Sequence, residues 1–277
     1  MMIHSIKSEF HKATHNRYFI IVLILAFLIQ MLSFAQFYEY IHEANQVKTL
    51  ADSMPTLHDS ESVYVYWIGH EAGSTGFYLA AYMLPLLAVI PFGWSLFSEI
   101  HNNYQNNMIC RLGKTKYFTA KYIAVFFTGA FVVAFMLLSN FVMCSFIGVL
   151  DAPQTYTLLT SVFRGYFASK LFYTHPFLFM LIWTGIAALW GGALAGLTMI
   201  FAQILKKSIF VLAAPFVIPI LLDSLLAIFH MSDWSFIKNY FVTTSAPNPP
   251  IIFFEIFALI AIGYIGGLVI YQRKEAL

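Results

Sequence analysis

Six long, apolar stretches dominate the chain and limit the folds that it can adopt. They cover residues 18–38, 76–97, 122–150, 176–205, 209–229 and 251–271. A helix needs about 20 apolar residues to cross a hydrocarbon layer about 30 Å thick, and each stretch meets that length. Among the 15 Lys and Arg and the 13 Asp and Glu residues, only Asp223 and Glu255 lie clearly inside these stretches. We therefore predict an all-α polytopic membrane protein with six transmembrane helices.

The scarcity of charge excludes several other classes of protein. The chain is 60% hydrophobic and 10% charged, whereas soluble domains are about a quarter charged. A soluble enzyme, a nucleic-acid-binding protein and a disordered chain are excluded on that ground. The two cysteines, Cys110 and Cys144, fit neither a disulfide framework nor the spacing of a zinc site.

The distribution of basic residues predicts the orientation in the membrane. With the N-terminus inside, 11 of the 15 Lys and Arg residues fall on the inner side, and six acidic residues fall in the first outer loop. The inner basic residues are Lys7, Lys12, Arg17, Arg111, Lys114, Lys116, Lys121, Lys206, Lys207, Arg273 and Lys274. The positive-inside rule then places both termini in the cytoplasm.

The first 17 residues have the pattern of an amphipathic helix. Its apolar residues share one arc at about 100° per residue; they are Ile3, Ile6, Phe10 and Ala13. We expect this helix to lie in the inner membrane interface and to lead into the first span. His11 and His15 have the spacing of a metal site, but they lack a nearby Cys or carboxylate ligand, so we predict a solvated face and no metal site.

The first outer loop, residues 39–75, is longer than a simple connection requires. Its early part has the composition to continue the first helix, and Met54-Pro55 would end that helix. Tyr64, Tyr66 and Trp67 are expected in the aromatic belt at the headgroups. The loop is either a gate over a lateral opening or a surface addition without a role in transport.

The segment 98–121, between the second and third spans, has an ordered arrangement of polar residues. Glu99 is followed by Asn107, then by Gly113, and then by Lys116. An ordinary cytoplasmic loop would account for the basic residues alone, because such loops are rich in Lys and Arg.

This arrangement resembles that of the ABC-2 type permeases of ABC transporters. The resemblance extends to the basic N-terminal helix (an elbow helix), the six spans, the large first outer loop and the short basic tail. It is closest to the bacterial permeases of peptide-antibiotic export and lantibiotic immunity, although those members often carry Gly-Thr where this chain has Asn103-Tyr104. The resemblance places the chain in the plasma membrane of a bacterium.

The resemblance also implies a mechanism and partners. Residues 98–121 would form a coupling helix that docks into a separate ATP-binding cassette ATPase subunit. The residues implied in this coupling are Glu99, Asn107, Met108, Arg111, Gly113, Lys114, Lys116 and Lys121. A second permease subunit, identical or not, would complete the transporter, which would export an amphipathic or hydrophobic substrate such as a peptide antibiotic or toxin.

The chain itself carries no G-x-x-x-x-G-K-[ST] phosphate-binding loop. We therefore expect the partner to bind ATP and Mg²⁺ and to hydrolyse the ATP, while this chain binds no cofactor and is not itself an enzyme. Asp223 and Glu255, both predicted in the outer half of the bilayer, either line the translocation path or have a structural role.

Proline and glycine indicate where the spans bend and where they pack closely. Pro85 and Pro91 in the second stretch, and Pro215 and Pro219 in the fifth, remove backbone donors and favour kinks. The pairs Gly192/Gly196 and Gly263/Gly267 have the G-x-x-x-G spacing that allows helices to approach closely.

Two other functional classes fit the chain less well. A stand-alone secondary transporter would usually show internal repeats and more polar ligands near the midplane. A membrane-embedded enzyme would need a nucleophile motif or a cluster of metal ligands inside the spans. Gly73-Ser74-Thr75-Gly76 is neither the G-x-S-x-G motif nor inside a span.

Overall fold

The structure is a computed structural model that describes residues 2–50, 62–67, 75–153, 162, 167–231, 234–235, 239 and 249–273, with only the backbone of 44–50. Its regular elements are helices. In chain order they are α1 (Met2–Thr14), α2 (Arg17–Leu50), α3 (Val63–Tyr66), α4 (Thr75–Val89), α5 (Ser95–His101), α6 (Tyr104–Leu112), α7 (Lys114–Cys144), α8 (Ser169–Thr174), α9 (Pro176–Ile204), α10 (Ser208–Ile228), α12 (Pro249–Ala261), the π-helix η2 (Ile262–Gly266) and α13 (Gly267–Arg273).

Among the described residues, five helices are long and apolar enough to cross a membrane. They are Arg17–Glu43 of α2, the whole of α7, α9 and α10, and the continuous unit Pro249–Arg273. This confirms the prediction of an all-α polytopic membrane protein. In this part of the chain the backbone groups are satisfied within helices, as a hydrocarbon environment demands.

The second predicted span is interrupted. Its main helix, α4, has 15 residues, which gives a length of about 22 Å against the hydrocarbon thickness of about 30 Å. A turn over residues 90–94 separates α4 from α5. Pro91 lies in this turn and has no N–H to continue the α-helical hydrogen bonds. Pro85, Pro215 and Pro219, by contrast, lie inside helices.

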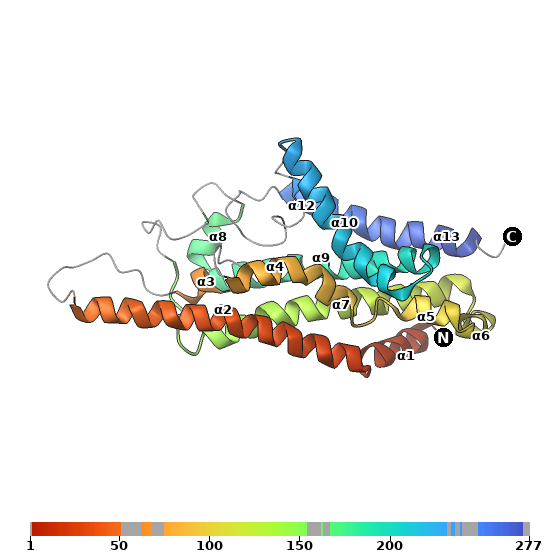
Figure 1. Cartoon of the computed structure of the whole chain (residues 1–277), viewed down its shortest axis with the longest axis horizontal. Coiled ribbons are helices and arrows are strands. Elements are labelled where there is room, and N and C mark those ends of the chain that lie inside the picture. The colour runs from red at the N-terminus through yellow and green to blue at the C-terminus, as the bar shows by residue number, and fades with distance from the viewer. Residues whose placement is uncertain are drawn as a thin grey trace.

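The helices form an elongated bundle in which α7 and α9 pack along one another (Figure 1). Their close approach depends on glycine. A Cβ on Gly192 would lie 2.8 Å from the Phe126 carbonyl oxygen, and one on Gly196 would lie 2.8 Å from the Tyr122 hydroxyl. A Cβ on Gly263 of η2 would lie 3.2 Å from the Gly196 backbone. The close packing predicted from the G-x-x-x-G spacing is therefore confirmed for these three glycines.

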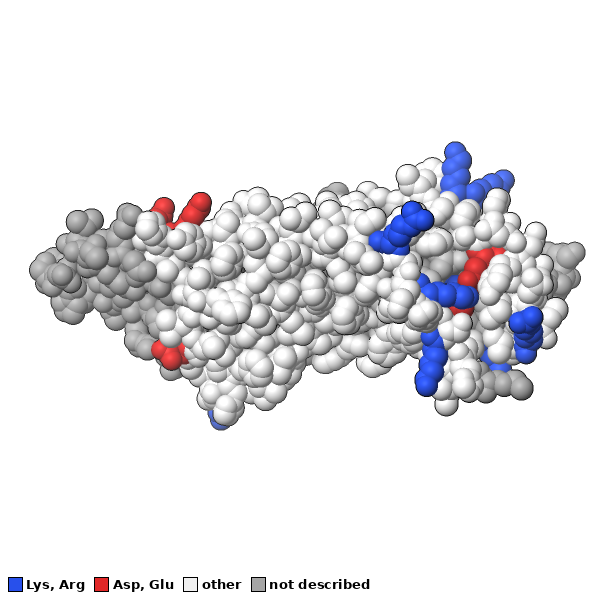
Figure 2. Space-filling model, turned by 90° about the horizontal axis from the view of Figure 1, so that it is seen from below, with Lys and Arg blue, Asp and Glu red and all other residues white. Residues whose placement is uncertain are grey.

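The two ends of the bundle differ in charge. The N- and C-termini lie at the same end (Figure 1), which also contains α1, α5 and α6; we call it the basic end. Figure 2 shows Lys and Arg gathered there, an uncharged middle, and acidic side chains toward the other end. We call that other end, where α3 and α8 lie, the opposite end.

At the opposite end, α3 is held on the residues that follow α7. The Val63 N–H donates to the Val149 carbonyl oxygen (2.9 Å), and the Ser62 hydroxyl donates to the Asp151 carbonyl oxygen (2.7 Å). These bonds turn Tyr64 and Trp67 inward, where their rings pack 5.5 and 6.4 Å from that of Phe141.

The prediction that Tyr64 and Trp67 face the headgroups is therefore wrong, because the anchoring of α3 buries both side chains. The helix that begins the predicted outer loop is present, since α2 continues to Leu50. The predicted break at Met54-Pro55 lies outside the described residues, as do 51–61 and 68–74 in general.

Candidate functional site

The segment between α4 and α7 folds as a helical hairpin at the basic end. Asn103, at φ 55°, adopts the left-handed conformation that separates α5 from α6, and Asn tolerates that conformation better than most residues. Gly113, at φ 79°, separates α6 from α7. A Cβ on Gly113 would meet nothing within 4 Å, so the backbone conformation, not lack of space, favours glycine there.

Helix α1 packs against this hairpin and α7 with a face that the sequence pattern did not indicate. Its buried residues are Ser5, Glu9 and Ala13, whereas Ile3 is 69% exposed. The face that α1 buries most deeply therefore lies beside the predicted apolar arc and shares Ala13 with it, while Ile6 and Phe10 of the arc are half-buried. In a membrane interface an apolar side chain can face lipid, which leaves a polar face free to pack against protein.

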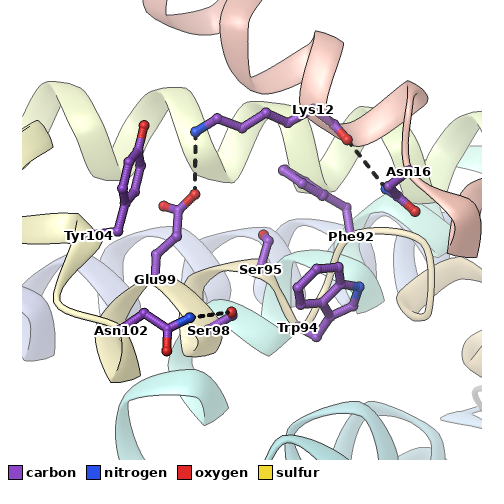
Figure 3. A pocket seen from close by; sticks show the side chains of 9 residues that line it. All are labelled: Lys12, Asn16, Phe92, Trp94, Ser95, Ser98, Glu99, Asn102 and Tyr104. Atoms are coloured by element: carbon purple, nitrogen blue, oxygen red, sulfur yellow. Dashed lines mark hydrogen bonds and ion pairs between the residues drawn. The ribbon is translucent and has the colours of Figure 1, made fainter.

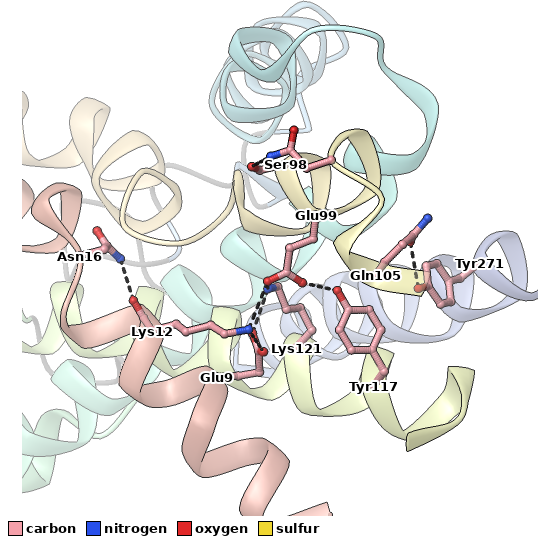
Figure 4. Close-up of polar contacts among 10 residues, drawn as sticks. Glu9, Lys12, Asn16, Ser98, Glu99, Gln105, Tyr117, Lys121 and Tyr271 are labelled. Carbon is pink, nitrogen blue, oxygen red and sulfur yellow. Dashed lines mark hydrogen bonds and ion pairs between the residues drawn. The ribbon is translucent and has the colours of Figure 1, made fainter. Parts of the chain in front are cut away.

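Four charged side chains meet where α1, α5 and α7 converge. Figure 3 shows Lys12 of α1 extended toward Glu99 of α5, and Figure 4 adds Glu9 of α1 and Lys121 of α7. Lys121 Nζ lies 2.8 Å from Glu9 Oε2 and 2.6 Å from Glu99 Oε1. Lys12 Nζ lies 2.6 Å from Glu9 Oε1 and 3.3 Å from Glu99 Oε1. We call these four residues the four-charge cluster; its formal charges sum to zero.

Aromatic side chains complete the surroundings of the four-charge cluster. The Tyr117 hydroxyl donates a hydrogen bond to Glu99 Oε2. The ammonium groups of Lys121 and Lys12 lie 4.9 Å and 5.0 Å from the ring centroids of Phe92 and Tyr104, respectively. Such cation–π contacts strengthen when water is excluded, and the side chain of Lys121 is 0% exposed.

The electrostatic environment favours the charged forms of Glu99 and Lys12. Burial alone would raise the pKa of Glu99, but the Lys121 ammonium, the Tyr117 hydroxyl and Lys12 hold that pKa below its ordinary value. Burial alone would lower the pKa of Lys12, yet the hydrogen bond and charge of Glu9, with Glu99, raise it above its ordinary value. Each group therefore stabilises the charged form of its neighbour.

The cluster joins three parts of the chain that lie far apart in sequence. A buried ion pair that loses one partner leaves an uncompensated charge, which destabilises a fold by about 3–5 kcal/mol. A displacement of α5 relative to α1 or α7 would break such pairs. The geometry therefore favours movement of the hairpin, α1 and the first turns of α7 as one unit.

The last helix adds a further connection to the hairpin. The Tyr271 hydroxyl of α13 donates to Gln105 Oε1 of α6 at 3.1 Å (Figure 4). Met108 and Ile109 of α6 pack, half-buried, against the apolar core at the basic end. One face of α6 is thus held by the bundle.

The residues implied in coupling by the sequence divide into three groups. Glu99 and Lys121 point inward and belong to the four-charge cluster. Met108 and Lys114 are half-buried, whereas the remaining four are exposed: Asn107, Arg111, Gly113 and Lys116. The predicted coupling segment 98–121 extends into α7, which begins at Lys114.

Glu9, Lys12 and Tyr117 are members of this site that sequence reasoning did not select. Glu9 lies outside the predicted apolar arc of the amphipathic helix, yet its side chain is 1% exposed. One signal was present in the sequence. A lysine entering an apolar helix needs a carboxylate partner if it is to be buried, and the predicted inner side has only three acids in its sequence, namely Glu9, Glu99 and Glu275.

A cavity of about 490 Å³ lies beside the four-charge cluster, between α1 and α5. Lys12 and Glu99 form part of its wall, together with Asn16, Trp94 and Tyr104 (Figure 3). The Asn16 amide donates to the Pro91 carbonyl oxygen at 2.9 Å, which ties the end of α1 to the turn that interrupts the second span.

Asp223 lies near the C-terminal end of α10, and Glu255 lies in the second turn of α12. Ser235 Oγ donates to Asp223 Oδ2, and Asn239 Nδ2 donates to Glu255 Oε2, each at 3.0 Å. Within the described residues no Lys, Arg or His forms an ion pair with either carboxylate. Both acids therefore accept hydrogen bonds from neutral side chains of the segment that connects α10 to α12.

His11 of α1 and His15, which follows this helix, have ring centroids 4.0 Å apart, and both side chains are exposed. In the part of the chain that the structure describes, no group of three or more His, Cys, Asp or Glu residues is arranged to hold a metal ion.

Comparison with protein-family models, curated proteins and solved structures finds no match to this chain. The fold and the contacts at the basic end therefore carry the functional argument.

Proposed function

We propose that this chain is the transmembrane permease subunit of an ATP-binding cassette exporter, driven by ATP that a separate ATPase subunit hydrolyses. The observation that carries the proposal is the four-charge cluster. It fixes the short helical hairpin to α1 and to the start of α7, at the end of the bundle where Lys and Arg gather. A hairpin held in this way can transmit a movement of a soluble partner to the spans.

The orientation of the chain supports the same proposal. The positive-inside rule places the basic end in the cytoplasm, which is where ATP is available. The interrupted α4–α5 segment would then complete six crossings, and an even number of crossings agrees with both termini lying at one end (Figure 1).

The exposed side of the hairpin supplies the docking surface. Asn107, Arg111 and Lys116 are exposed around α6 and the start of α7, while Met108 is half-buried beside them. A short helix that is held by the bundle on its apolar face and exposes polar and basic side chains on the other can enter a groove of a soluble partner. Glu99 and Lys121 would act behind this surface as positioning residues.

The proposals for the substrate and the second subunit rest on the resemblance and on the number and composition of the spans. Six helices are few to enclose a path, so we propose that two permease subunits, identical or not, act with two ATPase subunits in a bacterial plasma membrane. An amphipathic or hydrophobic substrate, such as a peptide antibiotic or toxin, suits an apolar, nearly uncharged interior. Asp223 and Glu255 are proposed to lie near the outer end of its path.

Co-purification tests this proposal. The chain would be expressed with the ATP-binding cassette ATPase encoded beside its gene, purified in detergent, and assayed for bound ATPase and for ATP hydrolysis. We expect a stable complex in which Arg111→Glu and Lys116→Glu each reduce binding about tenfold or more, because like charges at a docking surface repel.

The matched control is Lys170→Glu, which makes the same change of charge at an exposed position of α8, at the opposite end. It should bind the ATPase as the wild type does. Equal loss of binding in all three variants would contradict a docking surface at α6. Transport by the purified chain in proteoliposomes without any ATPase would instead favour a stand-alone secondary transporter.

A further inference from the structure

An apolar groove of about 620 Å³ opens on the side of the bundle where α1 and α2 meet α7. This volume lies within the range of sites that bind small molecules. The groove runs along α7 from Phe127 to Ala134, which corresponds to about 10 Å of helix. Alanines form part of its lining, namely Ala130, Ala134 and Ala188.

Two aromatic pairs connect the walls of this groove. The rings of Phe10 and Phe127 lie 6.1 Å apart, and those of Phe19 and Phe131 lie 5.9 Å apart. Thr128, a polar residue of the lining, donates its hydroxyl hydrogen to the Ala124 carbonyl oxygen. The groove therefore offers an occupant dispersion and apolar contact along its length, which suits a hydrocarbon chain.

Basic groups gather where the groove meets α1. Thr14 lines it there, and His15 Nδ1 lies 3.0 Å from the Thr14 hydroxyl oxygen. Lys7 and His11 are exposed and share the helix face of Phe10 and Thr14, because residues three, four and seven apart lie together on a helix.

Around this mouth, the described part of the chain has no exposed acid that offsets these basic groups. Glu9 is the one acidic residue of α1, and it is buried in the four-charge cluster on another face. The sequences of α7 and α9 contain no Asp or Glu, and α2 contains none before Glu39. The mouth of the groove therefore complements a negative charge, while its interior complements a hydrocarbon chain.

We propose that this groove binds one anionic glycerophospholipid, with an acyl chain between the two aromatic pairs and the phosphate against Lys7, His11 and His15. The lipid holds α1 to α7 on the side that the four-charge cluster does not reach. This site is independent of ATPase docking, because its lining includes none of the exposed residues of α6.

Lipid retention tests the proposal. The full chain would be placed in nanodiscs of equal parts phosphatidylglycerol and phosphatidylcholine, extracted in mild detergent and weighed by native mass spectrometry. We expect the wild type to retain one phosphatidylglycerol per chain. Ala134→Phe should reduce that retention about tenfold, which corresponds to excluding roughly two methylenes from the groove.

The matched control is Val142→Phe, which adds a ring on α7 at a position 54% exposed and outside the groove. It should retain phosphatidylglycerol as the wild type does. The double substitution Lys7→Gln with His11→Gln should leave total lipid retention intact but bring the ratio of phosphatidylglycerol to phosphatidylcholine close to one.

A photoactivatable acyl-chain phosphatidylglycerol gives a second measurement on the wild-type chain, so the test does not depend on the folding of a variant. Adducts should map to 127–134. Adducts elsewhere, or equal retention by Ala134→Phe and Val142→Phe, would overturn the proposal. Unchanged lipid retention with a dimer converted to monomer by Ala134→Phe would assign the groove to a second copy of the chain and would also overturn it.

Discussion

The two ends of the bundle differ in the partners that their acidic residues have. At the basic end, Glu9 and Glu99 are paired with Lys12 and Lys121 at distances from 2.6 to 3.3 Å. Toward the opposite end, Asp223 and Glu255 accept hydrogen bonds from Ser235 and Asn239. In the described part of the chain, the first pair of acids has cationic partners and the second pair has neutral ones.

Because of this difference, we expect the basic end to be sensitive to the loss of a charge and the opposite end to tolerate it. A buried ion pair depends on both partners, because either charge alone is poorly solvated in the protein. A carboxylate that accepts a neutral hydrogen bond can be replaced by an amide that keeps the acceptor. The same kind of substitution should therefore have unequal effects at the two ends.

The largest effect is expected for Lys121→Met, which keeps the length of the side chain but removes the ammonium group between Glu9 and Glu99. We expect it to destabilise the protein by about 3–5 kcal/mol, measured as loss of folded protein on heating in detergent. Adding Glu9→Gln should restore part of the stability, because residues in one network do not act additively. Two independent, additive losses would show that the cluster is not a coupled unit.

A smaller effect is expected for Tyr117→Phe, which removes the hydroxyl that donates to Glu99 and keeps the ring. Hydrogen bonds to charged groups contribute about 1.5–3 kcal/mol, so the melting temperature should fall, though less than for Lys121→Met. Tyr173→Phe is the matched control, because its hydroxyl donates to the neutral Val162 carbonyl oxygen near the opposite end. An equal loss in both variants would remove the distinction between the ends.

Acid should weaken the basic end selectively. The pKa of Glu99 is lower in the folded protein than its ordinary value of 4.5, so the folded state binds fewer protons and is favoured as pH rises through that range. This stability should be complete above pH 4.5 and should be lost as pH falls through the folded-state pKa. Thermal unfolding measured between about pH 3 and pH 8 would show the loss.

The control for the pH experiment is Glu99→Gln, which has no carboxyl group to protonate. Its stability should be lower than that of the wild type near neutral pH and should converge with it in acid. Parallel curves for the two proteins would show that Glu99 does not contribute to the acid sensitivity. Lys12 acts in the opposite direction: its raised pKa gives stability that is complete below 10.5 and is lost at higher pH.

The smallest effect is expected at the opposite end. Glu255→Gln keeps an oxygen that can accept from Asn239 and removes a carboxyl group that has no cationic partner among the described residues. We expect a change in stability within about 1 kcal/mol, with hydrogen exchange of α12 unchanged. A loss as large as that of Lys121→Met would show that Glu255 pairs with a cation.

The apolar stretches and the distribution of charge could be predicted because each depends on local composition. Five of the six predicted spans correspond to helices long enough to cross a membrane, and basic residues gather at one end of the bundle. The interruption of the second span could not be predicted as such, since Pro85 and Pro91 occur in the same stretch. Pro85 lies inside α4, and Pro91 lies in the turn after it.

The buried face of α1 and the partners of Lys121 were decided only by the tertiary structure. The sequence leaves Glu9 outside the apolar arc of an amphipathic helix and puts Lys121 in a docking segment, but the two residues are 112 positions apart and meet at 2.8 Å. Hydropathy fixes which segments leave water, because that free energy depends on each segment's own surface. Pairing of charges depends on which segments come together, and no local pattern contains that information.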